Sequence, residues 1–387
     1  MLYFIKVSKI MKLTDSNKSR NEDISYRKQI ARSLLDSQIE YEEPVMKSLL
    51  PAEILASLSA LKAISLPAIS WPRPELAPAP QPLNVTSPDE ELPSVEWLVI
   101  TWTKDEHKAL RRAFTPAIKI DDWYKYTHNF EAFIPDIRPG APSRRLGRIG
   151  SYYKVKIGNK DVLCFKSEFH LNQDGKKLPL KKMIKQLIEE TNAKYVLSIG
   201  TAGGVAAGDE LGDVVVSNSA LFNLKDEFKN EEFNNKKFQS SWDINETLFE
   251  EIRNQMVSIQ EPGYAPPTKR VPFKGQPLSL PPNSPNINYQ KEHPIITTDF
   301  FEFGNSANHL DQLGSAVEMD DAVIAMVCDE MVSKPKYAFV RNVSDPVLNG
   351  DLDERVQIMW AVWYYTQFGL ETSFNGALAT WSIIAGN

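Results

Sequence analysis

The sequence predicts an α/β protein with a mixed, mostly parallel central sheet and helices on both faces. From residue 95 onward, short apolar runs typical of buried strands alternate with amphipathic segments of helical period, and turn residues separate them. Hydrophobic residues make up 42% and charged residues 24% of the 387, as in ordinary globular proteins. A chain of this length is able to bury a large core and is too long for one average domain.

The expected elements follow the chain in order. An apolar strand over 95–102 precedes a helix over 104–114, and residues 151–167 form two strands around a turn at Gly158-Asn159. A helix over 179–193 starts with proline, which is favoured in the first turn. The remaining elements are strands over 195–200, 213–221 and 295–298, a helix over 318–331, a strand over 337–344 and a C-terminal helical region.

A proline-rich stretch over 67–93 marks the first expected boundary. It contains eight of the 26 prolines, which remove backbone donors and disfavour helix at the residue before them, so we expect an extended linker. Helical periodicity over 26–40 and 44–64 predicts a helical extension of unknown role over residues 1–66.

A second cluster of nine prolines interrupts the regular pattern nearer the C-terminus, between residues 262 and 294. Long irregular loops in compact domains are often functional. We therefore expect a surface loop insertion over 258–294 within one domain that spans 94–387.

Composition excludes several classes of protein. The 44 Lys and Arg against 50 Asp and Glu give a net charge of −6, whereas a general nucleic-acid binder is usually basic. We find no run of ~18 apolar residues for a membrane span and no signal-peptide core at the start. Cys164 and Cys328 are too few for a disulfide framework or a four-cysteine zinc site. We expect a cytoplasmic protein with two buried thiols and without metal or cofactor.

Three segments at the carboxyl ends of expected strands carry residues for chemistry, and ligands bind at such ends. Residues 200–204 hold three glycines in five positions, which allow backbone to approach a ligand or simply make a tight connection. Residues 317–321 hold three acids at an expected helix start, where they either interact with the helix dipole or bind a diol. Asp345 ends a strand before Pro346, as a turn residue or as a reacting acid.

These segments together resemble the purine nucleoside phosphorylase and uridine phosphorylase superfamily. The motifs SIGTAGGVAAGDELGDVVVS, TTDFFEF, AVEMDDAVIAMVCDE and FVRNVSD occur in the family's order, and the resemblance covers roughly residues 94–387. The chain is most similar to the nucleosidase branch typified by methylthioadenosine/S-adenosylhomocysteine nucleosidase. The resemblance implies a nucleoside phosphorylase-like fold, a purine nucleoside or nucleotide as substrate, and a homo-oligomer of two or more copies.

The resemblance also implies roles for single residues. Asp345 corresponds to the acid that supports protonation of the leaving purine, and Ser344 orients it. Glu106, after the first strand, matches the carboxylate that positions the attacking water, although Thr101 replaces the usual glycine of that turn. Asp320 is one methylene shorter than the family's glutamate. The implied substrate contacts are Thr201, Ala202, Gly203, Phe300, Phe301, Glu318, Met319, Asp320 and Arg341, and Phe301 is favoured over Phe300 for stacking on the base.

Hydrolysis is favoured over phosphorolysis. Phosphorylases of this superfamily hold phosphate with arginines, and one of these positions is Ser198 here. A phosphorylase and a non-catalytic nucleoside sensor stay open as alternatives. Two basic segments either form a solvated face or contact a 5′-phosphate. The residues that we expect to make such contacts are Arg144, Arg145, Arg148, His170 and Lys176.

Overall fold

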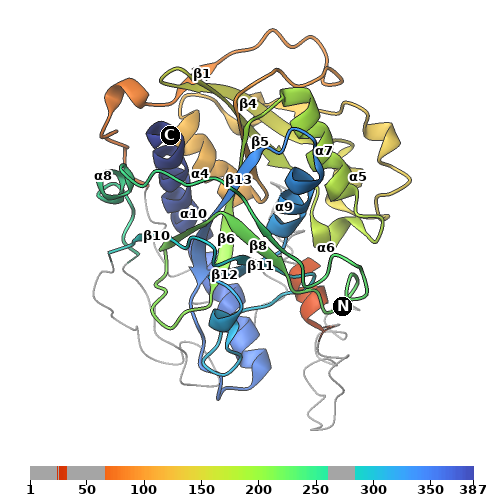
Figure 1. Cartoon of the computed structure of the whole chain (residues 1–387), viewed down its shortest axis with the longest axis vertical. Helices are drawn as coiled ribbons and strands as arrows, with labels where there is room; N and C mark the ends of the chain where they lie inside the picture. Colours follow the sequence, from red (N-terminus) through yellow and green to blue (C-terminus); the bar gives the residue numbers. More distant parts are fainter. Residues whose placement is uncertain (1–23, 25, 33–65, 260–283) are drawn as a thin grey trace, which may run out of the picture.

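The computed structural model describes residue 24 and residues 26–32, 66–259 and 284–387 of the chain. These residues form a 13-stranded mixed sheet with helices on both faces (Figure 1), which confirms the predicted α/β class. The predicted helix over 44–64 and most of the 258–294 insertion lie outside the described residues. Within the described ranges, no helix combines the length and the apolar character that crossing a membrane requires.

The ten-residue strand β6 (Tyr195–Gly204) lies at the centre of the sheet. It pairs in parallel with β2 (Trp97–Thr101) on one side and with β13 (Lys336–Asp345) on the other. Beyond β2 follow β5 (Lys160–Ser167) in parallel and β4 (Gly150–Ile157) antiparallel to it. The carboxyl ends of β5, β2, β6 and β13 therefore form one row at the same edge of the sheet.

The remaining strands extend the sheet from this centre. The short β12 pairs antiparallel with the last residues of β6 and leads in turn to β11, β8 and β9, while β7 and then β10 follow β13. Two further short strands, β1 and β3, pair antiparallel with β4. Their bounds are β1 (Ala79–Gln81), β3 (Tyr124–Tyr126), β7 (Val214–Ser217), β8 (Ser219–Phe222), β9 (Lys237–Gln239), β10 (Ile287–Tyr289), β11 (Ile295–Thr297) and β12 (Ala316–Glu318).

Helices cover the sheet on both faces because its strands are apolar on both. In β2, Leu98 and Ile100 join one buried cluster, whereas Trp97 and Val99 join the other. One face packs against α4 and the long α10, and the other against α7 and α9 (Figure 1). The helices are α4 (Lys104–Phe114), α5 (Pro142–Leu146), α6 (Leu171–Asp174), α7 (Pro179–Thr191), α8 (Phe249–Arg253), α9 (Asp321–Glu330) and α10 (Glu354–Gly386).

Three elements differ from the sequence prediction. Strand β6 continues through the glycines to Gly204, because β12 and β13 pair with that stretch. The predicted strand over 213–221 divides at Asn218 into β7 and β8, which pair with different partners. Glu318 belongs to β12 rather than to a helix, since it pairs with Thr297 of β11, and α9 starts only at Asp321.

The proline-rich residues 67–93 lie along the domain. They contribute β1 to the sheet edge, and Trp71 packs on Trp381 of α10 with ring centroids 4.8 Å apart. The Trp381 Nε1–H donates to the carbonyl of Leu76 over 2.7 Å. In the 258–294 insertion, residues 287–289 form β10, so part of the expected loop is a strand of the sheet.

Candidate active site

The carboxyl ends of β2, β6 and β13 meet at a pocket that brings most of the predicted site residues together. Residues from seven separate parts of the chain line it, because the parallel pairing of these strands brings their ends together. The predicted residues among its lining are Glu106, His170, Thr201, Ala202, Gly203, Phe301, Glu318, Met319, Asp320, Arg341, Ser344 and Asp345.

Glu106 lies in the first turn of α4, directly after β2, and is 2% exposed. Its Oε2 accepts hydrogen bonds from the backbone N–H groups of Trp102 (3.0 Å) and Thr103 (2.8 Å), as expected for a glutamate that caps its own helix. Its Oε1 reaches across to β6 and accepts from the backbone N–H and the hydroxyl of Thr201, each at 2.9 Å. These four donors fix the position of the carboxylate in the pocket.

Two glycines of β6 allow acidic and basic side chains to lie against the strand. A Cβ at Gly200 would stand 2.2 Å from Arg341 Nη1 and 3.0 Å from Glu106 Oε1. A Cβ at Gly203 would stand 2.9 Å from Asp345 Oδ2. The glycine-rich segment is therefore needed for close approach of side chains to the backbone.

A β-bulge at the end of β13 orients Asp345. The register with β6 shifts between Val343 and Asp345, so Ser344 is the extra residue and the strand bends there. The Ser344 hydroxyl lies 2.9 Å from Asp345 Oδ1 and 3.3 Å from the Ala202 carbonyl oxygen. Burial raises the pKa of Asp345 to about 7, although the Ser344 hydrogen bond opposes the shift. The carboxyl is thus able to hold a proton at neutral pH.

Arg341 is held by acidic residues behind the pocket wall. Its Nε donates to Asp321 over 2.7 Å, and its Nη2 bonds Asp321, Ser198 (2.8 Å) and Glu318 (3.1 Å). Burial and the neighbouring carboxyl raise the pKa of Glu318 to about 8, and burial raises that of Asp321. Because the two buried carboxyls of Glu318 and Asp321 share the one guanidinium of Arg341, the carboxyl pair favours a bound proton.

Asp320 lies between α9 and the segment that follows β5. Its Oδ2 is 2.9 Å from His170 Nδ1, and its Oδ1 accepts from the Leu171 backbone N–H over 2.9 Å. His170 is 1% exposed and Asp320 is 4% exposed, yet both line the pocket. The His170 ring also lies 5.5 Å from that of Trp102. The structure therefore joins His170 to a predicted ribose contact.

The two adjacent phenylalanines face different surroundings. Phe301, which the family resemblance favours over Phe300 for stacking on the base, lines the pocket. Phe300 does not line the pocket and lies instead under the cations of Arg27 and Lys225, at 5.8 and 5.5 Å from the ring centroid. Of the two, only Phe301 is placed to stack on a ligand in this pocket.

The four predicted cations lie outside the pocket. Arg148 forms a fork on the buried Glu168, with Nε and Nη2 at 3.0 and 2.7 Å from Oε1. Arg144 and Arg145 donate to backbone carbonyls of residues 137 and 140, and Lys176 is exposed. Of the residues expected to contact a 5′-phosphate, the structure brings only His170 into the site.

Sequence reasoning missed Trp102, Thr103 and Tyr365, which also line the pocket. Trp102 and Thr103 directly follow β2, so the rule that ligands bind at strand ends would have identified them. Tyr365 lies in the middle of α10, and nothing in the spacing of that helix marks it. Burial and the nearby carboxylate of Glu106 raise the pKa of Tyr365 well above its ordinary value, so its hydroxyl stays protonated.

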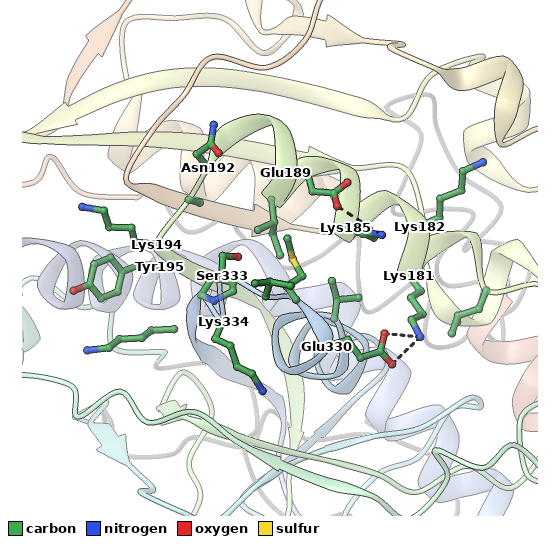
Figure 2. A pocket seen from close by; sticks show the side chains of 18 of the residues that line it. Lys181, Lys182, Lys185, Glu189, Asn192, Lys194, Tyr195, Glu330, Ser333 and Lys334 are labelled. Atoms are coloured by element: carbon green, nitrogen blue, oxygen red, sulfur yellow. Dashed lines mark hydrogen bonds and ion pairs between the residues drawn. The ribbon is translucent and has the colours of Figure 1, made fainter.

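A larger hollow of about 1010 Å³ lies at the opposite edge of the sheet, between α7 and the connection from α9 to β13 (Figure 2). Tyr195 and Lys336, at the amino ends of β6 and β13, line it. Its lysines form surface pairs, such as Lys181 with Glu330 at 2.8 Å. Because none of the predicted site residues lines this hollow, the chemistry is assigned to the pocket at the carboxyl ends.

Comparison with known proteins places the chain in a family. The family model of the phosphorylase superfamily matches residues 127–360, more than half of the chain, and the protein belongs to this superfamily. No curated protein matches the sequence.

Solved structures similar to this chain include 5′-methylthioadenosine/S-adenosylhomocysteine nucleosidase from Helicobacter pylori with butyl-thio-DADMe-Immucillin-A. It shares 14% identity over 75% of this chain and 98% of that chain, with a TM-score of 0.45. The corresponding nucleosidase from Neisseria meningitidis with methylthio-immucillin-A shares 16% identity over 76% and 100%, with a TM-score of 0.41. A futalosine hydrolase mutant from Helicobacter pylori shares 16% over 75% and 99%, with a TM-score of 0.44.

Proposed function

We propose that this protein is an N-ribosyl hydrolase that cleaves the glycosidic bond of a purine nucleoside or nucleotide, with adenine as the base. One observation carries the proposal: two carboxyl groups in contrasting environments line one pocket. Glu106 is surrounded by hydrogen-bond donors, whereas burial raises the pKa of Asp345 to about 7. An acid and a base set apart by their environments are what general acid–base catalysis needs.

The two groups divide the reaction between them. Water, oriented by the Glu106 carboxylate, adds its oxygen to C1′ of the sugar and gives up a proton to that carboxylate. The bond from C1′ to N9 breaks, and its electron pair leaves with the base. Asp345 donates its proton to N7, so the purine departs neutral, and Phe301 stacks on its ring. Free base and free sugar are the products.

The charge of the pocket favours water over phosphate. Besides Glu318 and Asp345, whose pKa values are raised, its described lining includes the carboxyl groups of Glu106, Glu302 and Asp320. The Arg341 guanidinium is neutralised by its ion pair with Asp321, so it offers little charge to an anion. An acidic pocket stabilises the positive charge that develops on the sugar and repels phosphate.

Product analysis tests the proposal. The protein is incubated with adenosine, methylthioadenosine, AMP and ATP, with and without phosphate, and bases and sugars are separated by chromatography. We expect adenine and free sugar at a rate independent of phosphate. Sugar 1-phosphate would make the protein a phosphorylase, and binding without release of base would make it a sensor. The same preparation tests by light scattering the homo-oligomer that the family resemblance implies.

A further inference from the structure

The connection between β5 and α6 is held rigidly against the pocket. Glu168 is fully buried between Arg148 and Lys166, which both form ion pairs with it. Phe169 donates its backbone N–H to the Ser167 hydroxyl over 2.9 Å, and its ring packs edge-on against Phe133. These two cations, of which Lys166 is buried, therefore anchor the segment that carries His170.

His170 is fixed from its other side by Asp320. The Asp320 carboxylate lies 2.9 Å from His170 Nδ1 and accepts a hydrogen bond from the Leu171 backbone N–H over 2.9 Å. It therefore sets both the orientation of the imidazole ring and the position of the chain at Leu171. Because Nδ1 lies against Asp320, Nε2 is the ring nitrogen that can reach a ligand in the pocket. The carboxylate also determines which nitrogen carries the proton in the neutral ring.

The order of the strands places His170 at one end of the ligand. Along the row β5, β2, β6 and β13, His170 follows the first, Glu106 follows the second and Asp345 ends the last. Three strand spacings of about 4.8 Å separate the ends of β5 and β13. With the base at Asp345 and the water at Glu106, the group near His170 belongs to the sugar.

We propose that His170 contacts an oxygen of the sugar part of the substrate through Nε2, with Asp320 as its positioning residue. This assignment rests on the proposed function. It makes His170 a determinant of specificity for an oxygen of the sugar part: a ribose hydroxyl donates to Nε2 of the neutral ring, whereas a 5′-phosphate oxygen accepts from Nε2 when both ring nitrogens carry protons. The Asp320 side chain is one methylene shorter than the family's glutamate at this position. In this proposal it acts on the sugar through the imidazole of His170.

The test compares five compounds, namely adenosine, its 2′-deoxy, 3′-deoxy and 5′-deoxy analogues, and AMP, in the wild type and in His170→Phe. Phenylalanine preserves the ring beside Trp102 and removes both nitrogens. We expect kcat/KM to fall about 10-fold or more for compounds that carry the contacted oxygen and to stay unchanged for the analogue that lacks it. The analogue whose kcat/KM stays unchanged lacks the contacted oxygen and therefore identifies it. A loss confined to AMP identifies the 5′-phosphate.

Two further variants separate contact from structure. His170→Gln keeps a hydrogen-bonding group near the Nε2 position and should recover part of the discrimination. Asp320→Asn still accepts from the Leu171 N–H but presents an NH₂ to Nδ1, which reverses the tautomer of His170. We expect it to raise KM more for the same compounds than for the spared analogue.

An equal loss for all five compounds in His170→Phe would overturn the proposal, because it would show that His170 only supports the fold. If the wild type releases adenine from none of them, the proposed hydrolase activity fails, and calorimetric binding of the same compounds replaces kinetics. A difference in Kd between wild type and His170→Phe for only some compounds then supports the contact. Equal Kd values, or no binding at all, overturn it.

Discussion

Asp345 shows how burial alone adjusts a single side chain for acid chemistry. Its carboxyl ends a strand within the core, where burial disfavours the charged form and raises the pKa to about 7. Glu106, which follows the strand two positions away in the sheet, accepts hydrogen bonds from donors of two elements. We propose that the same functional group serves as the acid at Asp345 and as the base at Glu106.

Asp345→Asn should stop proton delivery without changing the shape of the pocket. The amide still fits beside Gly203 and still donates a hydrogen bond, but it holds no acidic proton. We expect kcat for adenosine to fall ~100-fold or more while purine binding persists, measured by turnover and by calorimetry. Ser344→Ala is the matched control. We expect a smaller fall in kcat, because this change removes only the hydroxyl that orients Asp345. Near-normal kcat in Asp345→Asn would remove this residue from the mechanism.

The expected pH dependence of the activity follows from the raised pKa of Asp345. In the proposed mechanism Asp345 is the acid, so its protonated form is the active one, and that form is present below about pH 7 and is lost above it. We expect kcat/KM to decline roughly tenfold per pH unit on the alkaline side of this value. The residual activity of Asp345→Asn should lack this decline. A rate that rose through pH 7 would instead indicate a base with that pKa.

At the scale of elements, the proline-rich residues 67–93 are more than a spacer. They add β1 to the edge of β4, and Trp71 and Leu76 contact Trp381 in the last turns of α10. Proline suits this path because its fixed φ and missing N–H favour extended chain at a sheet edge. The domain boundary expected at residue 94 stays a prediction.

Trp71→Ala tests whether this packing stabilises the domain. The substitution removes the ring that rests on Trp381, and we expect a loss of about 2 kcal/mol, below the ~3–5 kcal/mol of a fully buried tryptophan, because Trp71 is only partly buried. Denaturant unfolding monitored by circular dichroism gives the value. Glu75→Ala, a change in the neighbouring turn, should leave stability within ~0.5 kcal/mol. An unchanged midpoint for Trp71→Ala would identify the segment as a passive linker.

At the scale of the whole molecule, the N-terminal residues 26–32 connect to the pocket wall. This stretch is helical as predicted, and Arg27 bonds Glu302 at 2.5 Å and lies 4.9 Å above the ring of Phe303. Glu302 lines the pocket next to Phe301. A segment some 270 residues away along the chain thus supports the loop that holds the proposed base-stacking ring.

Arg27→Leu should therefore weaken substrate binding more than it slows turnover. Loss of the ion pair frees the 300–303 loop, and we expect KM for adenosine to rise about 3- to 10-fold, as for one hydrogen bond to a charged group. Lys28→Leu is the control, since Lys28 pairs with Asp226 and Glu227, which do not line the pocket. Equal effects of the two changes would mean that the segment contributes to general stability alone.

The sequence by itself determined the strands and their ends, and through them most of the site. Apolar runs and turn residues locate β2, β6 and β13, and parallel strands bring their carboxyl ends to one edge. Glu106 follows β2, whereas the glycines after residue 199 and Asp345 form the last residues of β6 and β13, so local pattern and motif order were sufficient to place them near this edge. The prolines of residues 67–93 predicted an extended linker, yet this stretch adds strand β1 to the edge of the sheet. Local pattern does not predict this, because pairing at a sheet edge depends on the neighbouring strand.

Only the tertiary structure decided how side chains from distant elements pair. Arg148 was expected to contact a phosphate, yet it is engaged by Glu168, while His170 from the same region enters the pocket beside Asp320. Tyr365 reaches the pocket because α10 packs along α4 and β13, a contact that no local pattern encodes. The physical reason is that backbone propensity acts over a few residues, whereas the partner of a buried charge is whichever opposite charge the packing brings within reach.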